Sequence, residues 1–516
     1  DAPCPECGGK LYERVSKRGR HFYGCENYPT CQFVSWDMPV TDKCPDCGSR
    51  MVLKRNAKGD AYHLCVNENC KKRVPVSAKM NRVTVVGAGL AGCEAAWQLA
   101  RRGIPVRLVD MKPKKHSPAH TLDSFSELVC SNSLKAEHLT NASGLLKAEM
   151  ALLDSLILNC AQWARVPAGG ALAVDREAFS LRVTEILKSE PLIEIATGQV
   201  VDAIPEAPAI LATGPLTDEA LVGAIEALPG VHKLHFFDAA APIVTLESID
   251  MSKVFRASRY GRGADYLNCP MTEAEYNRFY DALVAAQTND PHGFEKSLVF
   301  EGCLAVEILA SRGRQTLAFG PLKPVGLVDP RTGKMPYAVV QLRQDDAAGT
   351  LYNLVGFQTR LKWGEQKRVF SLIPGLEHAE FARYGVMHRN TYLNSPDVLG
   401  ANYALRANPL LRFAGQITGV EGYMESAASG LTAAIALAER LRGNAEPDFT
   451  GKTMLGALER YVRTPNAHFQ PMNANFGLLE PLGERVKGKR QRYEKLAERA
   501  LATLAAFALP KEEETV

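Results

Sequence analysis

The stretch that decides the fold is residues 82–110, RVTVVGAGLAGCEAAWQLARRGIPVRLVD. An apolar strand (82–86) runs into a glycine-rich turn, a helix is expected over 93–102, and a second strand over 104–109 ends at Asp110. This order predicts a β-α-β unit that holds the pyrophosphate of a dinucleotide at a helix N-terminus. The turn residues that we expect to contact the cofactor are Gly87, Ala88, Gly89, Leu90, Ala91 and Gly92.

Each glycine of this turn has a separate expected task. Gly87 permits the tight turn, Gly89 lets the backbone approach a pyrophosphate, and Gly92 lets the helix pack closely on the strand. Asp110, about twenty residues further on, is placed to accept a ribose hydroxyl. The alternative is a buried glycine turn in an ordinary α/β domain, but the complete β-α-β context favours nucleotide binding.

The first eighty residues contain an internal repeat. The turn at 4–8, CPECG, recurs forty residues later at 44–48, CPDCG, and each copy has two further cysteines downstream. In each copy, the CPxCG turn and the downstream pair place four thiolates around one Zn²⁺, and domains this small need a metal to fold. Disulfides are the alternative reading of these cysteines. The predicted ligands are Cys4, Cys7, Cys25 and Cys31 of the first structural zinc site, and Cys44, Cys47, Cys65 and Cys70 of the second.

The paired CPxCG turns and the segment 23–31, YGCENYPTC, resemble the C-terminal zinc ribbons of bacterial type IA DNA topoisomerases. The resemblance implies binding of single-stranded DNA or RNA. Five aromatic side chains in the first copy could stack on bases between cations such as Arg18 and Arg20, or they could form the small core of the ribbon itself. They are Phe22, Tyr23, Tyr28, Phe33 and Trp36.

Length and composition predict several domains in one soluble chain. The protein has 516 residues, 46% of them hydrophobic, and a formal net charge of +4. No apolar run is long enough to span a bilayer, so we expect a cytoplasmic protein with no membrane partner. A boundary is expected at Met80, which has the position of an original start. The ribbons are then either a fusion or the tail of a neighbouring reading frame.

Seven motifs after Met80 match one family. They are 127–133 (ELVCSNS), 166–176 (VPAGGALAVDR), 300–303 (FEGC), 337–350 (YAVVQLRQDDAAGT), 384–391 (YGVMHRNT), 413–430 (FAGQITGVEGYMESAASG) and 469–478 (FQPMNANFGL). Several of them are shared loosely with a related group of flavoproteins, but the settings of Cys130 and Cys303 are not. On these motifs the chain resembles the folate- and flavin-dependent tRNA (uracil-5-)-methyltransferases, the TrmFO/Gid family. The resemblance implies FAD, methylenetetrahydrofolate as carbon donor, NAD(P)H as reductant, and the T loop of tRNA, at position 54, as the partner.

The later glycine turns are also typical of a flavoprotein. A buried strand is expected over 209–214, ending in Thr213 and Gly214, a second approach of backbone to FAD, and another short strand over 413–416, which includes Gly415. Gly422 and Tyr423 lead into a helix expected over 424–442, whose N-terminus would face the flavin. We therefore expect an α/β fold, a Rossmann-like FAD domain of the glutathione-reductase type with an inserted α+β domain. The expected boundaries are 1–40 (ribbon 1), 41–79 (ribbon 2 and linker), 80–231 (FAD domain), 232–395 (inserted substrate domain) and 396–516 (FAD domain, with a C-terminal helix over 483–509).

The resemblance also implies roles for two thiols. Cys303 would add to C6 of uracil and make C5 nucleophilic towards the folate-derived methylene group, and Cys130 would act as the general base that removes the C5 proton. From residue chemistry alone, a buried inert cysteine is the commoner fate of either thiol.

Two other functions remain open from the sequence. One is another FAD-dependent oxidoreductase related to wobble-uridine modification. The other is a non-enzymatic nucleic-acid-binding protein in which the zinc ribbons dominate.

Overall fold

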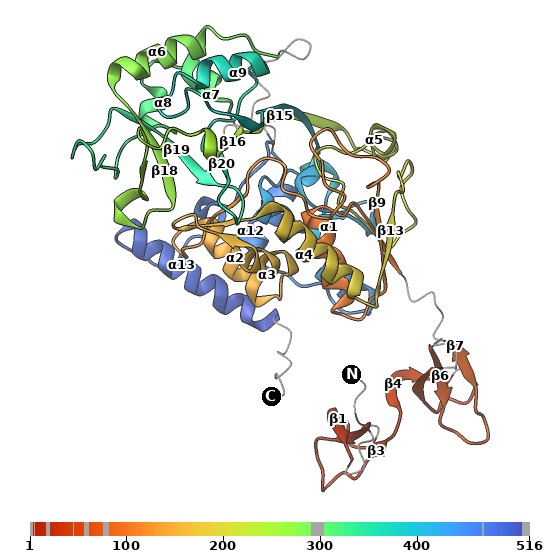
Figure 1. The fold of residues 1–516 in the computed structure, drawn as a ribbon. Helices are drawn as coiled ribbons and strands as arrows, with labels where there is room; N and C mark the ends of the chain where they lie inside the picture. Colours follow the sequence, from red (N-terminus) through yellow and green to blue (C-terminus); the bar gives the residue numbers. More distant parts are fainter. Residues whose placement is uncertain are drawn as a thin grey trace. The chain divides into compact units, whose positions relative to one another are not determined.

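The computed structural model describes residues 4, 6–16, 21–44, 46–55, 61–75, 82–289, 304–466 and 469–507 (Figure 1). The chain divides into two compact units, residues 1–82 and 83–516. The predicted nucleophile Cys303 and the expected boundary at Met80 lie outside the described residues. Within the described part of the chain, no helix is long and apolar enough to cross a membrane.

The N-terminal unit consists of two small antiparallel sheets. Their strand orders are β1-β2-β3 and β4-β5-β6-β7. The buried side chains are mainly cysteines: Cys4, Cys25 and Cys31 surround Phe33 in one cluster, and the second cluster joins two cysteines to Met51. Cores this small do not stabilise a fold alone. The strands are β1 (Leu11–Val15), β2 (His21–Cys25), β3 (Val34–Ser35), β4 (Met38–Lys43), β5 (Arg50–Arg55), β6 (Ala61–Cys65) and β7 (Arg73–Pro75).

A six-stranded sheet in the order β13-β9-β8-β14-β24-β23 forms the centre of the second unit. All neighbouring strands are parallel except β23 and β24. Parallel pairing brings the carboxyl ends of β8, β14 and β24 to one edge, and each is followed by one of the predicted glycine turns. The strands are β8 (Val83–Val86), β9 (Val106–Asp110), β13 (Ile193–Thr197), β14 (Ala209–Leu211), β23 (Ala404–Leu405) and β24 (Asn408–Phe413).

Two helices, α1 (Leu90–Ala100) and α11 (Tyr423–Leu441), follow two of these glycine turns and pack on each other. A Cβ atom at Gly430 would lie 2.1 Å from the Ala91 carbonyl oxygen, so the two backbones touch at this point. Both helices belong to the main apolar core. The other elements of this part are α2 (Ala142–Leu152), α3 (Leu156–Trp163), α4 (Arg176–Ser189), α5 (Glu219–Glu226), α12 (Met454–Arg463) and α13 (Lys489–Leu504), with a small sheet of β10 (Ser133–Ala136), β12 (Ala171–Val174) and β11 (Arg165–Val166).

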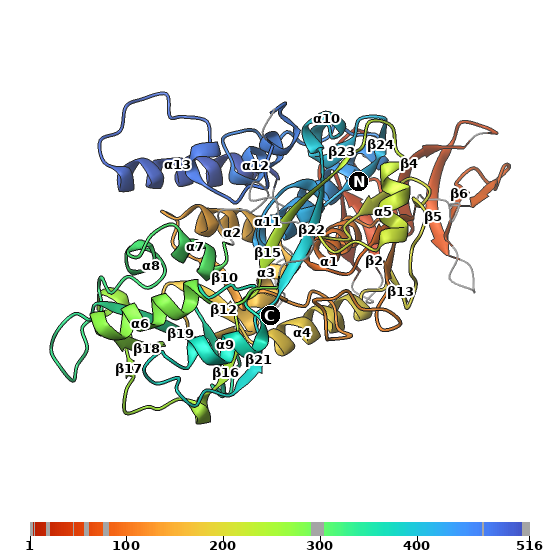
Figure 2. The same cartoon turned by 90° about the horizontal axis from the view of Figure 1, so that it is seen from above.

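A second six-stranded sheet, in the order β17-β18-β19-β20-β16-β21, has its own apolar core. Helices α6, α7, α8 and α9 gather beside it (Figure 1). Two long antiparallel strands, β15 and β22, lead the chain into this region and back (Figure 2). The elements are β15 (Lys233–Ala239), β16 (Ile243–Thr245), β17 (Phe255–Arg256), β18 (Tyr266–Met271), α6 (Glu273–Val284), α7 (Val306–Ser311), α8 (Thr316–Phe319), β19 (Ala338–Gln344), β20 (Leu351–Leu354), α9 (Trp363–Phe370), β21 (Phe381–Arg383) and β22 (Met387–Leu393).

The expected bounds of five elements were wrong. Two of these elements are strands: β14 ends at Leu211 rather than residue 214, and β24 covers Asn408–Phe413 rather than 413–416. The first helix begins at Leu90 rather than residue 93, because the end of the glycine turn is already its first turn. The second strand runs over Val106–Asp110 rather than 104–109. The C-terminal helix begins at Lys489 rather than residue 483 and ends at Leu504, because Gly488 has a φ of +87°, which does not continue a helix.

Candidate flavin and zinc sites

A cavity opens at the carboxyl edge of the parallel sheet. Its empty volume, including the mouth that is open to solvent, is about 1180 Å³, large enough for a dinucleotide. Ligands in open α/β sheets bind at this edge. Of the predicted cofactor residues, all except Gly92 and Gly422 line the cavity: Gly87, Ala88, Gly89, Leu90, Ala91, Asp110, Gly214, Gly415 and Tyr423.

The glycine turn is shaped for close approach. A Cβ atom at Gly89 would meet no atom within 4 Å, so this position faces open space. A Cβ atom at Gly92 would lie 1.8 Å from the Gly87 carbonyl oxygen, which explains why Gly92 supports packing rather than lining the cavity. Neither α1 nor α11 has a side-chain cap at its N-terminus. The positive dipole end of α1 therefore remains available to an anionic group such as the pyrophosphate of FAD, whereas the first turn of α11 already contains the buried carboxylate of Glu425.

Asp110 holds the turn from the end of β9. Its Oδ2 accepts a hydrogen bond from the Ala88 N–H at 2.7 Å, and its Oδ1 accepts one from the Lys112 N–H at 2.9 Å. The side chain also lines the cavity. Because each carboxylate oxygen has a second lone pair, Asp110 can order the turn and still accept a ribose hydroxyl.

A loop over residues 117–127 covers one side of the cavity. The Glu127 carboxylate accepts hydrogen bonds from the N–H groups of Thr121 and Leu122 at 3.0 Å, and so fixes the loop. The His120 ring bonds the Ser117 hydroxyl at 2.5 Å. Burial and the nearby Lys112 charge lower the pKa of His120, so its ring is neutral at pH 7. Ser117, His120 and Glu127 all line the cavity.

Tyr423 connects the flavin-facing helix to the Cys130 segment. Its phenolic oxygen accepts hydrogen bonds from the N–H groups of Cys130, at 2.7 Å, and Ser131, at 3.1 Å. Burial raises the pKa of the Tyr423 hydroxyl, which keeps the phenol neutral. The predicted thiol is thereby tied to the first residue of α11.

The inserted sheet holds the same segment from the other side. Arg343 of β19 is buried, and it donates to the Ser131 hydroxyl at 2.7 Å and to Asn132 Oδ1 at 2.9 Å. The Asn132 amide donates in turn to the Gln344 carbonyl at 2.9 Å. Arg343 and Arg383 both interact electrostatically with Cys130. Positive charges of this kind favour a thiolate.

Burial distinguishes the described cysteines outside the ribbons. Cys93, Cys160 and Cys269 are buried, and burial raises the pKa of Cys93 and Cys160 to about 12 and that of Cys269 still further. Cys130 is only partly buried. It is thus the one cysteine of this described set with access to a substrate.

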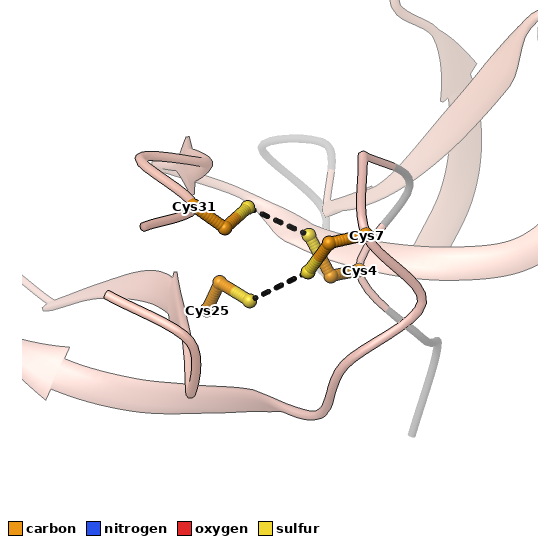
Figure 3. Close-up of side chains that lie close together, drawn as sticks. All are labelled: Cys4, Cys7, Cys25 and Cys31. Atoms are coloured by element: carbon orange, nitrogen blue, oxygen red, sulfur yellow. Dashed lines mark hydrogen bonds between the residues drawn. The ribbon is translucent and has the colours of Figure 1, made fainter. Parts of the chain in front are cut away.

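The two cysteine clusters of the N-terminal unit fit zinc. In the first, Cys4 and Cys31 sulfurs lie 3.6 Å apart and those of Cys7 and Cys25 lie 3.3 Å apart (Figure 3). The corresponding pairs of the second cluster, Cys44 with Cys70 and Cys47 with Cys65, lie 3.7 and 3.5 Å apart. A tetrahedron of four sulfurs bound to Zn²⁺ has edges of about 3.8 Å, so both clusters match a structural site.

Both clusters are built on the same turn. Gly8 and Gly48 each adopt a positive φ, +75° and +67°, and each donates its N–H to the carbonyl of the first cysteine of its copy at 2.8 Å. A hydrogen bond from the Gly9 N–H contributes most to lowering the pKa of Cys7 to about 6, which favours the thiolate that a metal requires.

Three residues that line the cavity, and Arg343, which holds the Cys130 segment, were not found by reading the sequence. Glu127 and Arg343 lie inside motifs that carry the family resemblance, so their motifs were a usable signal. Ser117 and His120 lie in no recognised motif, and their position depends on how the 117–127 loop packs. No local pattern could have identified them.

A parallel sheet with its glycine turn, two uncapped helix ends and a joint cavity define a dinucleotide-binding flavoprotein, here joined to two C4 zinc ribbons. The family described as "Glucose inhibited division protein A" matches residues 82–445, and "Topoisomerase DNA binding C4 zinc finger" matches residues 1–40 and 41–79. Two solved structures of Aquifex aeolicus GidA superpose with a TM-score of 0.62 at 14% and 16% identity. Each alignment covers 84% of this chain, and 74% and 77% of the two GidA chains. At such low identity the similarity supports the fold alone.

The curated relatives are much closer in sequence. A protein of Bacillus licheniformis is 59% identical over 424 residues, which are 82% of this chain and 98% of that protein. A protein of Desulforudis audaxviator is 60% identical over 435 residues, which are 84% of this chain and 99% of that protein. Both are named methylenetetrahydrofolate–tRNA-(uracil-5-)-methyltransferase TrmFO. The chain belongs to the TrmFO/GidA family of flavoproteins. The resemblance read from its motifs is confirmed, as are the fold class and the two Cys4 ribbons.

Proposed function

We propose that this protein is an FAD- and folate-dependent tRNA (uracil-5-)-methyltransferase that forms 5-methyluridine at position 54 of the T loop. The observation that carries the proposal is the coverage of the named methyltransferases: 98% or more of their length is matched at 59–60% identity. Nearly the whole length of these methyltransferases is therefore matched by this chain. Methylenetetrahydrofolate is the carbon donor and NAD(P)H the reductant.

The residues of the cavity fit FAD. The open space at Gly89 and the uncapped helix ends suit its pyrophosphate and its flavin ring. When bound and reduced, FAD supplies the hydride that completes the methyl group. The protein contributes the rigid frame, in which Asp110 orders the turn and Glu127 orders the covering loop.

We assign the two thiol roles to Cys303 and Cys130. The Cys303 sulfur would bond to C6 of the target uracil, which makes C5 nucleophilic towards the methylene group of the folate. After C5 has bonded to the methylene carbon, Cys130 would take the proton from C5 while the bond between that carbon and the folate nitrogen breaks, so that tetrahydrofolate leaves and the carbon becomes an exocyclic methylene group. Hydride from the reduced flavin would complete the methyl group, and the C6–sulfur bond would break to release the Cys303 thiolate. The support for Cys130 is its partial exposure beside the cavity and the two nearby arginines, Arg343 and Arg383. A thiolate is the form of cysteine that can accept a proton.

The target uridine is stacked inside the folded T loop, so the enzyme must extract it before a thiol can reach C6. We propose that the region over 232–395 binds the tRNA arm, between FAD-domain parts at 80–231 and 396–516. Support comes from its separate core and from the Arg343 contacts that bring it to the Cys130 segment.

The ribbons at 1–40 and 41–79 would bind single-stranded nucleic acid. Trp36, Tyr28 and Tyr12 are exposed large aromatics of the described ribbon residues. Flat exposed rings among basic side chains are typical of single-strand binding.

The proposal is tested with a T-arm hairpin that carries 5-fluorouridine at the target position. Fluorine cannot leave as a proton does, so the Cys303 adduct should accumulate and survive denaturing gel electrophoresis. Cys303→Ala should form no adduct, whereas Cys130→Ala should form it and yet fail to methylate normal tRNA. Adduct formation by Cys303→Ala would refute the assignment of the nucleophile.

A further inference from the structure

An exposed aromatic stack lies at the start of α9. Trp363, the first residue of this helix, is 59% exposed. Its ring stacks on that of Tyr384, with centroids 5.5 Å apart and planes 13° apart, and Tyr384 stacks on Phe381 at 4.9 Å and 13°. Three rings are thus nearly parallel, and the outermost is largely open to solvent.

The stack is held rigidly. The Phe381 ring packs beside the buried Phe370 ring, with the two ring centroids 6.4 Å apart, against the apolar core of this sheet. The Gln366 amide donates to the carbonyl oxygens of Leu361 and Gly385 at 2.8 Å and accepts from the Gly385 N–H at 2.8 Å. These bonds tie α9 to the loop that carries Tyr384. A planar ligand on Trp363 would therefore meet a surface that is already ordered.

Cations flank the exposed ring. Lys362 and Lys367 are exposed and form no ion pair with any described residue, whereas Arg368 of the same helix is paired with Glu365 at 2.5 Å. Arg383, next to Tyr384 in the chain, is partly buried and interacts electrostatically with Glu127 and Cys130. Lys362 also donates to Gln287 Oε1 at 3.1 Å and interacts electrostatically with Glu365. A flat ring beside exposed lysines suits a ligand that combines a base with phosphate.

The stack is also linked along the chain to the Cys130 side of the proposed site. Arg383, the residue before Tyr384, interacts electrostatically with Cys130. The loop that carries the middle ring of the stack therefore also carries a side chain that interacts with the assigned general base.

We propose that Trp363 is a stacking platform for an RNA base, that of a nucleotide adjacent to the target uridine, with Lys362 and Lys367 contacting its phosphates. This inference rests on the proposed function. When the target uridine leaves the stack of the T loop, its neighbour loses a stacking partner, and the indole ring can replace it. Any base has a face that can stack, so the platform would hold the loop open without reading its sequence.

The test compares Trp363→Ala and Trp363→Phe with a matched control, Trp163→Ala, in the full-length protein. Trp163 is 62% exposed and ends α3, on a part of the molecule away from this stack. Loss of one base–aromatic contact should weaken binding of a T-arm hairpin about five- to a hundred-fold in Trp363→Ala. Trp363→Phe and Trp163→Ala should bind nearly as the wild type does, with FAD content and the KM for methylenetetrahydrofolate unchanged in all three.

A second hairpin identifies the occupant. Two versions are made, each without the base of one of the two nucleotides that flank the target. When the missing base is the one that stacks on Trp363, wild type and Trp363→Ala should bind the hairpin with equal affinity. Equal hairpin affinity of Trp363→Ala and wild type would overturn the inference, and so would a rise in the folate KM alone, which would assign the ring to the pterin. Because hairpin binding is measured without turnover, it remains interpretable even if the protein does not methylate tRNA.

Discussion

The backbone N–H of Cys130 donates a 2.7 Å hydrogen bond to the phenolic oxygen of Tyr423, 293 residues further along the chain. The same oxygen accepts from Ser131. Because Tyr423 is also the first residue of α11, one side chain fixes the thiol segment relative to the helix end that opens on the flavin cavity.

Tyr423→Phe should therefore slow methylation without removing FAD. The change leaves two N–H groups without their acceptor, at a cost of about 1–3 kcal/mol in the placement of the segment. We expect turnover to fall roughly ten- to a hundred-fold. Turnover and flavin absorbance of the purified variant are measured beside Tyr461→Phe, which loses a hydrogen bond to Gln470 away from the cavity. Full activity in Tyr423→Phe would show that this bond does not position Cys130.

Gly89→Val should give a folded, colourless protein. The new side chain would occupy the open space at the turn, where the pyrophosphate is expected to approach. Gly223→Ala in α5 is the control, because its Cβ atom also meets nothing within 4 Å but lies outside the cavity lining. The flavin spectrum and circular dichroism of both variants check the prediction. A yellow Gly89→Val protein with normal FAD content would contradict it.

The parts of the site that could be predicted from sequence depend on short, local patterns. The spacing of Gly87, Gly89 and Gly92 fixes a turn by steric need, and each CPxCG turn aims two thiols at one point. Arg343 could not be assigned in this way. Its contact with Ser131 joins residues 212 positions apart and exists only because the inserted sheet packs on the FAD domain.

Helix ends show a similar limit. The periodicity of the C-terminal helix was predicted, but its start was placed too early. The apolar and basic pattern continues through residues 483–488, and only the positive φ of Gly488 stops the helix there. A glycine in such a segment can lie inside a helix or just before its first residue, so the sequence alone could not give the start of this helix.

Glu94 should make stability depend on pH. Burial raises the pKa of its carboxyl to about 7, while it accepts hydrogen bonds from Ser155 and Ile157. A raised folded-state pKa means that its contribution is complete below about pH 4.5 and is lost as the pH rises through 7. Relative to Glu94→Gln, the wild type should lose about 1–3 kcal/mol between pH 5 and pH 8. Thermal unfolding midpoints of both proteins across this range provide the measurement, and a constant difference would be evidence against the assignment.

A shortened chain that begins at Met80 should fold, bind FAD and methylate tRNA at nearly the full rate. The second unit has its own cores, and the cysteines of the ribbons are all used by structural metal. The full-length protein should contain about two zinc ions and show an added, salt-sensitive affinity for single strands. Zinc content, single-strand binding at two salt concentrations and methylation rate are compared between the two proteins. Loss of methylation with FAD retained would place the ribbons in the tRNA site.

The most direct test of the central claim is transfer of the labelled carbon. The purified full-length protein is incubated with unmodified tRNA, NAD(P)H and methylenetetrahydrofolate labelled in its methylene group, and the modified base is mapped by nuclease digestion and mass spectrometry. The account predicts one labelled 5-methyluridine per tRNA, at position 54, that depends on both the folate and the reductant. Label at another position, or none despite bound FAD and folded tRNA, would contradict it.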